Sequence, residues 1–189
     1  MKKLKITFNS PVVLGFIFVS LAVLLLGFVT MGKSNELLFM TYHSALTNPL
    51  TYLRLFTHVL GHAGWEHYIG NASYILLLGP MIEEKYGSKR ILQVILVTAL
   101  VTGVINYILF PSVALCGASG VVFAFILLTS FTSFKQGEIP LTFILVAIIF
   151  LGQQVYEGVF LQDNISNFSH VLGGIIGSVV GYRLNRRAM

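Results

Sequence analysis

One serine in this sequence lies between glycines and directly before an apolar run: Gly117-Ala118-Ser119-Gly120 leads into the segment that ends near Phe131. Glycine is costly inside a helix but useful where the backbone turns sharply or closely approaches another group. The start of a helix offers unpaired N–H groups and the positive end of the helix dipole. A hydroxyl there can attack a carbonyl carbon while nearby N–H groups hold the oxyanion. Ser119 is therefore a candidate nucleophile, and a plain N-cap serine is the alternative reading.

His170 lies near the start of the last apolar segment and could be the base that such a serine needs. A neutral imidazole can take the hydroxyl proton, and its ordinary pKa lies near working pH. A histidine that only hydrogen-bonds between helices is the alternative. Glycines follow it at a spacing of four, which is typical of close helix approach: Gly173, Gly177 and Gly181. If this face meets Gly120 and Ala124, it brings His170 to Ser119.

Two further polar residues, His67 and Asn71, are four positions apart and would share one face of a helix. Both can donate hydrogen bonds. Aimed at a carbonyl attacked by Ser119, they could complete an oxyanion hole together with the Ser119 backbone N–H. A polar pair that joins helices by hydrogen bonds is the alternative.

A metal site would be the obvious reading of three closely spaced histidines, His58, His62 and His67. His58 and His62 would share a face of a continuous helix, as in zinc sites. However, no H-E-x-x-H motif is present, and Gly61 and Gly64 interrupt the helix. We therefore expect structural loop histidines, with no metal and no cofactor.

The chain has one cysteine, Cys116, which excludes an internal disulfide. Cys116 could in principle act as a nucleophile with His170, but it precedes the glycine turn. We therefore rank it below Ser119 and expect a packing role.

The composition indicates a polytopic membrane protein, because 56% of the 189 residues are hydrophobic and only 10% are charged. Soluble domains carry about 25% charged residues. Six apolar segments that could span a bilayer follow one another: about residues 11–31, 67–82, 91–110, 119–131, 141–156 and 168–182. The first is too long for a signal peptide and is read as a retained helix. We predict an all-α six-helix bundle in one membrane domain, residues 1–189.

Two connections matter to this prediction. The first, about residues 33–66, is rich in apolar and aromatic side chains, which favours a structured loop at the membrane interface with short amphipathic helices. The second, Glu157 to Asn167, is polar and is predicted to be a loop.

The distribution of cations predicts the orientation of the bundle. Ten of the twelve lysines and arginines fall on the side of the N-terminus: Lys2, Lys3, Lys5, Lys85, Lys89, Arg90, Lys135, Arg183, Arg186 and Arg187. By the positive-inside rule both termini are cytoplasmic, and Ser119, His67, Asn71 and His170 lie in the outer half of the bilayer. Polar groups at such depth usually face a polar interior or one another. The bilayer also explains the net charge of +5 without nucleic acid as a partner.

Three stretches resemble the rhomboid family of intramembrane serine proteases. They are His62-x4-His67-x3-Asn71, Gly117-Ala118-Ser119-Gly120 and His170-x2-Gly173-x3-Gly177, in this order. Glu83 followed by Tyr86-Gly87-Ser88 is similar to the family's end of the second helix. The resemblance covers about Tyr52 to Tyr182. One departure is Leu53-Arg54, where the family often has Trp-Arg.

The resemblance implies an enzyme without a cofactor that cleaves transmembrane protein substrates. Ser119 would be the nucleophile and His170 the general base, a dyad without a carboxylate. His67, Asn71 and the Ser119 backbone N–H would bind the oxyanion. The site would be reached by water from the outer face, and the fifth helix with the loop of residues 157–167 would form a movable side gate.

Two alternatives to a protease differ from it in what they predict for the sequence. A catalytically silent rhomboid-like protein would bind or escort membrane proteins, but such members typically lack the serine or the histidine. A small transporter or channel predicts internal repeats or charges deep in the spans, and the sequence has neither. A short chain of this kind is typical of a bacterial inner membrane, and the sequence leaves the oligomeric state open.

Overall fold

The structure is a computed structural model that describes residue 4 and residues 6–132, 138–160 and 164–187. Within these ranges the chain is helical, with one isolated backbone bridge between Thr41 and Leu115, and this confirms the predicted all-α class. The helices are α1 (Pro11–Val29), α2 (Lys33–Leu38), α3 (Pro49–Thr57), the 3₁₀ turn η1 (His58–Leu60), α4 (Trp65–Tyr86), α5 (Ser88–Leu109), α6 (Ser119–Ser130), α7 (Leu141–Phe160) and α8 (Asn164–Arg187).

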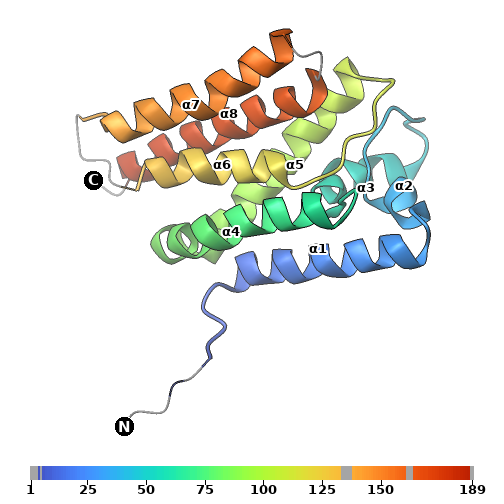
Figure 1. The fold of residues 1–189 in the computed structure, drawn as a ribbon, viewed down its shortest axis with the longest axis horizontal. Helices are drawn as coiled ribbons and strands as arrows, with labels where there is room; N and C mark the ends of the chain where they lie inside the picture. The colour runs from blue at the N-terminus through green and yellow to red at the C-terminus, as the bar shows by residue number, and fades with distance from the viewer. Residues whose placement is uncertain (1–3, 5, 133–137, 161–163, 188–189) are drawn as a thin grey trace.

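The long helices form a bundle with α6 at its centre (Figure 1). Helix α4 packs between α1 and α6, and α6 packs most extensively against α8. Helix α5 crosses the bundle at an angle, while α7 lies against α8 and α6. The start of α1 and the end of α8 lie at one end of the bundle, and α2 and α3 lie at the other (Figure 1).

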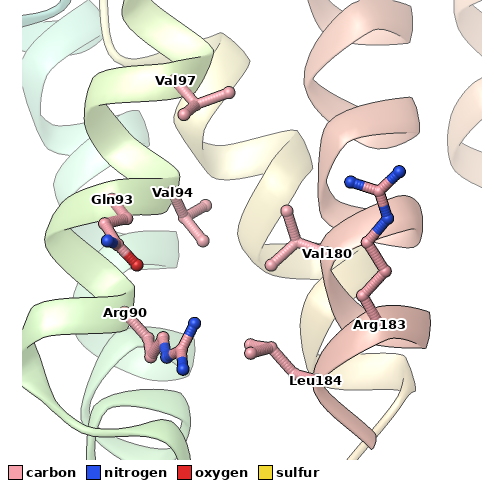
Figure 2. Close-up of a pocket in the computed structure, with 7 residues that line it drawn as sticks. All are labelled: Arg90, Gln93, Val94, Val97, Val180, Arg183 and Leu184. Atoms are coloured by element: carbon pink, nitrogen blue, oxygen red, sulfur yellow. The ribbon is translucent and has the colours of Figure 1, made fainter. Parts of the chain in front are cut away.

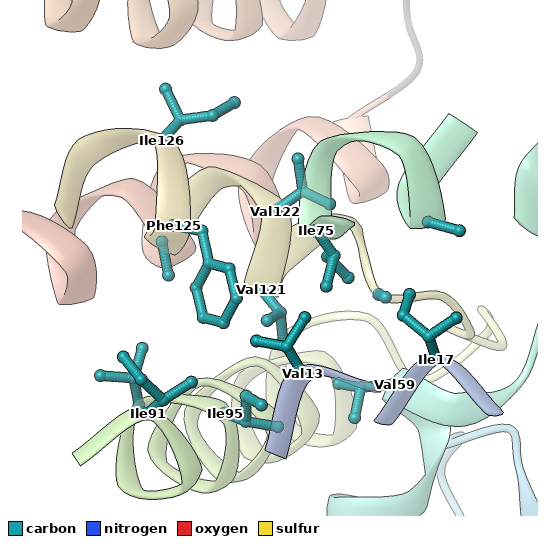
Figure 3. Packing of buried hydrophobic residues seen from close by; sticks show 14 of the residues in the cluster. Val13, Ile17, Val59, Ile75, Ile91, Ile95, Val121, Val122, Phe125 and Ile126 are labelled. Atoms are coloured by element: carbon teal, nitrogen blue, oxygen red, sulfur yellow. The ribbon is translucent and has the colours of Figure 1, made fainter. Parts of the chain in front are cut away.

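The core of the bundle forms around α6 because this helix is apolar on nearly all its sides. Val121 and Phe125 of α6 are fully buried, and they pack with Val13 of α1, Ile75 of α4 and Ile91 of α5 (Figure 3). A helix surrounded in this way cannot shift without disturbing its neighbours. The residue at its beginning is therefore held in a fixed position.

The connection between α7 and α8 is shorter than predicted. The proposed loop from Glu157 to Asn167 is wrong at both ends, because α7 continues to Phe160 and α8 already begins at Asn164. Hydropathy marks where contact with lipid ends, whereas backbone hydrogen bonding can continue beyond that point. Residues 161–163 of this loop, and the break predicted at Lys135 to Gly137, lie outside the described residues.

The first loop contains the short helices that its composition predicts, α2, α3 and η1. Its internal anchor is Arg54, which is 2% exposed. The Arg54 guanidinium lies 4.2 Å from the centre of the Tyr42 ring, and it donates hydrogen bonds to the Tyr42 hydroxyl and to Ser44 Oγ. Leu53, where the family often has tryptophan, is exposed. The departure at Leu53 thus affects the surface of the loop and leaves the Arg54 anchor in place.

Two of the described helices, α1 and α5, are both long and apolar enough to cross a membrane. Helix α6 and the segment Leu141–Tyr156 are apolar but shorter. The structure therefore agrees with a membrane fold, while the count of six spans and the cytoplasmic position of the termini remain predictions.

Candidate active site

Ser119 is the first residue of α6, and Ala118 occupies the N-cap position without a side-chain cap. The simple N-cap reading of Ser119 is therefore not what the structure shows. The preceding loop is held by backbone hydrogen bonds, from Gly117 N to His58 O (2.9 Å) and between Leu115 and Thr41 in both directions (2.8 and 2.9 Å). Gly117 has a φ of 126°, a region that favours glycine. These contacts fix the turn that presents Ser119.

Helices α6 and α8 approach each other at the level of their backbones. A Cβ atom on Gly173 would lie 2.0 Å from the carbonyl oxygen of Gly120, and one on Gly177 would lie 2.1 Å from that of Ala124. This confirms the predicted meeting of the glycine face with Gly120 and Ala124. Because His170 precedes Gly173 by one turn and Ser119 precedes Gly120, the contact places both residues on facing turns.

The His170 ring is held between two other side chains. It stacks on Phe123 with ring centroids 4.5 Å apart and planes 5° apart. Phe123 lies one helical turn after Ser119, so the ring rests on the same helix that carries the serine. The second neighbouring side chain is Gln154 of α7, whose Oε1 lies 2.5 Å from His170 Nδ1. A carbonyl oxygen can only accept, so with Oε1 toward the ring this contact favours the tautomer that has its proton on Nδ1.

Sequence reasoning missed both Gln154 and Phe123. A signal for Gln154 was present, since an amide side chain in an apolar segment usually faces a polar partner. Gln154 is 7% exposed. The signal for Phe123 is its spacing of four from Ser119, but its contact with His170 depends on how α6 and α8 pack.

His67 and Asn71 lie on α4 beside the same turn. A Cβ on Gly117 would lie 2.6 Å from His67 Cε1 and Nε2, so the imidazole occupies the space that Gly117 leaves. Asn71 is 8% exposed, and its Nδ2 atom has no hydrogen-bond partner among the described residues. A buried donor without a partner is costly. The cost is explained if an oxygen of a bound ligand accepts from Asn71.

The remaining histidines have structural contacts of their own. His58 Nδ1 lies 3.1 Å from Arg54 O and its Nε2 lies 3.2 Å from Thr102 Oγ1, so both nitrogens are engaged. Burial lowers the pKa of His58 to about 4 and keeps the ring neutral. His62 Nδ1 lies 3.1 Å from Leu60 O. These contacts agree with loop histidines that anchor η1 and the following turn.

Cys116 is a half-buried free thiol close to the serine. Burial raises the pKa of its thiol. Because the thiolate is the nucleophilic form, a raised pKa makes Cys116 a poorer nucleophile. This agrees with the packing role that the sequence predicts.

The site combines a serine that begins a buried helix with a histidine on the adjacent helix, in a helical fold with apolar spans. Comparison with known proteins agrees with this description. The Rhomboid domain family matches residues 49–187, so this chain belongs to the rhomboid family. It is an integral membrane protein of that family.

The chain is similar to several curated proteins. It is 25% identical over 171 residues to Rhomboid protease GlpG of Haemophilus influenzae, covering 88% of each chain. It is 29% identical to Rhomboid-related protein 2 of Mus musculus, over 72% of this chain and 52% of that protein. It is 32% identical to Rhomboid protease GluP of Bacillus subtilis, over 66% of this chain and 24% of that protein. The chain thus spans about half the length of the mouse protein and about a quarter of the Bacillus subtilis protein.

Proposed function

We propose that this chain is an intramembrane serine endopeptidase that hydrolyses peptide bonds in or near transmembrane segments of other membrane proteins. The observation that carries the proposal is the position of the His170 ring. It stacks on Phe123, one turn after Ser119, while Gln154 accepts from its Nδ1. In the proposed dyad, His170 Nε2 would be the basic nitrogen that takes the proton from Ser119 on the adjacent helix. Membership of a family with relatives named proteases supports the same activity.

The proposed reaction proceeds through an acyl-enzyme. Ser119 Oγ attacks the carbonyl carbon of the substrate while its proton passes to His170 Nε2. The tetrahedral intermediate collapses, the C–N bond breaks, and His170 returns the proton to the leaving amine. A water molecule then attacks the ester carbonyl with His170 again as base, and this releases the acid product and the Ser119 hydroxyl.

The oxyanion of the tetrahedral intermediate would be held by the backbone N–H of Ser119 together with His67 and Asn71. The unpaired Nδ2 of Asn71 and the contact of His67 with Gly117 support this role. Donors fixed before the reaction stabilise the developing charge without having to reorganise. No cofactor or metal takes part in this scheme.

The substrates would be transmembrane helices that unwind locally. A helix hides its peptide carbonyls in hydrogen bonds, so the enzyme can cleave only where those bonds open. In the proposed six-span topology both termini are cytoplasmic and Ser119 lies below the outer surface. Helix α7 would form the side gate, because it packs on α6 and α8 at the edge of the bundle (Figure 1). The proposed location is a bacterial inner membrane.

A cleavage assay tests this proposal. The purified protein is given a model single-span substrate with small residues near one end of its helix, and product is compared between wild type, Ser119→Ala and His170→Ala. We expect cleavage by wild type and none above background by either variant. Ser112→Ala, an exposed serine in the loop before α6, and His43→Ala, an exposed histidine, serve as matched controls that keep activity. Equal product from all five proteins would rule out the dyad, and no product from wild type would favour the silent escort protein.

A further inference from the structure

His62, a loop histidine that takes no part in the proposed reaction, contacts the proposed oxyanion donor His67. The two imidazole rings meet edge to face, with ring centroids 5.1 Å apart and planes 69° apart. His62 is 2% exposed, so its ring belongs to the interior of the protein. A close-packed neighbour of this kind limits the directions in which a side chain can turn.

Packing holds the His67 ring, because the ring makes no hydrogen bond within the described part of the chain. The imidazole occupies the space that Gly117 leaves, where a Cβ atom would lie 2.6 Å from its Cε1 and Nε2. The ring also lines a hollow of about 500 Å³, together with Ala63, Gly64, Trp65 and Glu66. The pocket between α5 and α8 is lined by residues of those two helices and does not reach the ring (Figure 2). Because the first hollow gives the ring room to turn, its orientation depends on its contacts with Gly117 and His62.

His62 is itself fixed by contacts with three other parts of the chain. Its Nδ1 lies 3.1 Å from Leu60 O, which can only accept, so Nδ1 donates the hydrogen bond. Its backbone carbonyl accepts a hydrogen bond from Asn35 Nδ2 at 3.1 Å. Its ring meets the Tyr68 ring edge to face, with centroids 5.4 Å apart, and the Tyr68 hydroxyl donates to Ile17 O of α1 at 3.1 Å. The ring that supports His67 is therefore anchored to the first loop and, through Tyr68, to α1.

We propose that His62 is a positioning residue that holds the His67 imidazole against Gly117, beside the turn that presents Ser119. This inference rests on the proposed function, because it concerns how His67 is placed in the oxyanion hole. Burial, together with the neighbouring His67, lowers the pKa of His62 to about 4. His62 is therefore neutral at working pH and acts on His67 by packing. Donors that are fixed before the reaction stabilise the oxyanion best, so losing this support lowers kcat and leaves KM nearly unchanged.

A double-mutant cycle with His67 tests the inference by cleavage of the single-span substrate. His62→Asn keeps an N–H near the position of Nδ1 but removes the ring, whereas His62→Phe keeps a ring against His67. We expect His62→Asn to lower kcat about tenfold with little change in KM, and His62→Phe to retain most of the rate. In a His67→Ala background, His62→Asn should have no further effect, because it acts only through His67. His43→Asn, on an exposed histidine, is the matched control. An equal loss from His62→Asn in both backgrounds would overturn the inference, because it indicates a general role in folding of the loop.

Chemical modification gives a second test that does not depend on proteolysis. Diethyl pyrocarbonate carbethoxylates accessible imidazoles, and peptide mass spectrometry of the full chain measures the rate at each histidine. We expect slow modification of His67 in wild type and His62→Phe, and a rate close to that of the exposed His43 in His62→Asn. If His62→Asn does not fold, His62→Gln gives the same comparison with more of the volume kept. An unchanged rate at His67 would overturn the positioning role, whereas a wild type that shows this pattern without cleaving substrate would count against the proposed function alone.

Discussion

Gln154 fixes the orientation of the His170 ring without adding a charge. Its side-chain carbonyl lies 2.5 Å from His170 Nδ1, which favours the tautomer with its proton on Nδ1 and leaves Nε2 as the base. In serine proteases with a triad a carboxylate has this task. We regard Gln154 as a positioning residue, because it acts on the reaction only through His170.

Replacing Gln154 tests this positioning role. We expect Gln154→Leu to lower kcat by roughly 10- to 100-fold with little change in KM, because the wrong tautomer becomes accessible while substrate contacts remain. Gln154→Glu keeps an acceptor for Nδ1 and should retain much more activity than Gln154→Leu. Gln153→Leu, at the exposed neighbouring position, is the control. Equal losses in Gln154→Leu and Gln154→Glu would indicate a packing role instead.

The second prediction for a single side chain concerns the kinetic effect of removing the Asn71 amide. If its unpaired Nδ2 binds the oxyanion, Asn71→Ala lowers kcat by about 10²-fold while KM changes little. Ser73→Ala, at an exposed position on the same helix, should leave both parameters unchanged. Steady-state kinetics with the single-span substrate measures both. A rise in KM at constant kcat for Asn71→Ala would assign Asn71 to substrate binding and would contradict an oxyanion role.

Among the helices, the contact of α6 with α8 is the element that brings the site together. Gly173→Ala places a methyl group where the Gly120 carbonyl oxygen lies, so the two helices must separate. We expect a loss of stability of about 1–3 kcal/mol and a larger loss of activity, since Ser119 and His170 move apart. Gly152→Ala on α7 meets no atom within 4 Å and is the control. Thermal unfolding and cleavage rate are measured for both. Full activity of Gly173→Ala would show that close packing here is not required.

Glu83 joins α4 to the start of α1. Its carboxylate accepts hydrogen bonds from Val12 N (3.0 Å), Val13 N (2.9 Å) and Ser88 Oγ (2.7 Å). It therefore caps a helix far away in the sequence and also complements the positive end of that helix dipole. The sequence marked Glu83 only by its resemblance to the family. Its partners could not be predicted because they depend on how α1 packs against α4.

We expect Glu83→Ala to destabilise the protein by about 1–3 kcal/mol, because three donors lose their acceptor. Glu84→Ala removes the same charge from an exposed position and should have a much smaller effect. The midpoint of thermal unfolding in detergent measures the difference. Equal midpoints for the two variants would contradict the capping role of Glu83.

For the chain as a whole, acid sensitivity follows from the buried His58. Its pKa is lowered by burial from 6.5 to about 4, so the unfolded chain takes up the proton before the folded one does. The contribution of His58 to stability is therefore fully present above pH 6.5. It is lost as the pH drops toward 4, which lowers the free energy of unfolding by about 3 kcal/mol. We expect His58→Gln to reduce the slope of the unfolding midpoint against pH in this window. His43→Gln, on an exposed histidine, should leave the slope unchanged. Identical slopes for both variants and wild type would contradict this assignment.

The helical class and the candidate residues for chemistry could be predicted from the sequence, because both depend on residue type and local spacing. Ser119, the α8 glycines and their meeting with Gly120 could be deduced since close helix approach requires small residues at a spacing of four. Gln154, Phe123 and the capping role of Glu83 could not, because each acts across helices whose relative rotation no local pattern fixes. The predicted loop of residues 157–167 is wrong at both ends, because polar residues favour a loop while helical hydrogen bonding continues to Phe160 and resumes at Asn164.

Labelling with a fluorophosphonate tests most directly whether His170 activates Ser119. The probe reacts with an activated serine hydroxyl, and peptide mass spectrometry locates the adduct. We predict one adduct, on Ser119, in wild-type protein, and none in Ser119→Ala or His170→Ala under the same conditions. Undiminished labelling of His170→Ala, or an adduct at any other serine, would contradict the central claim.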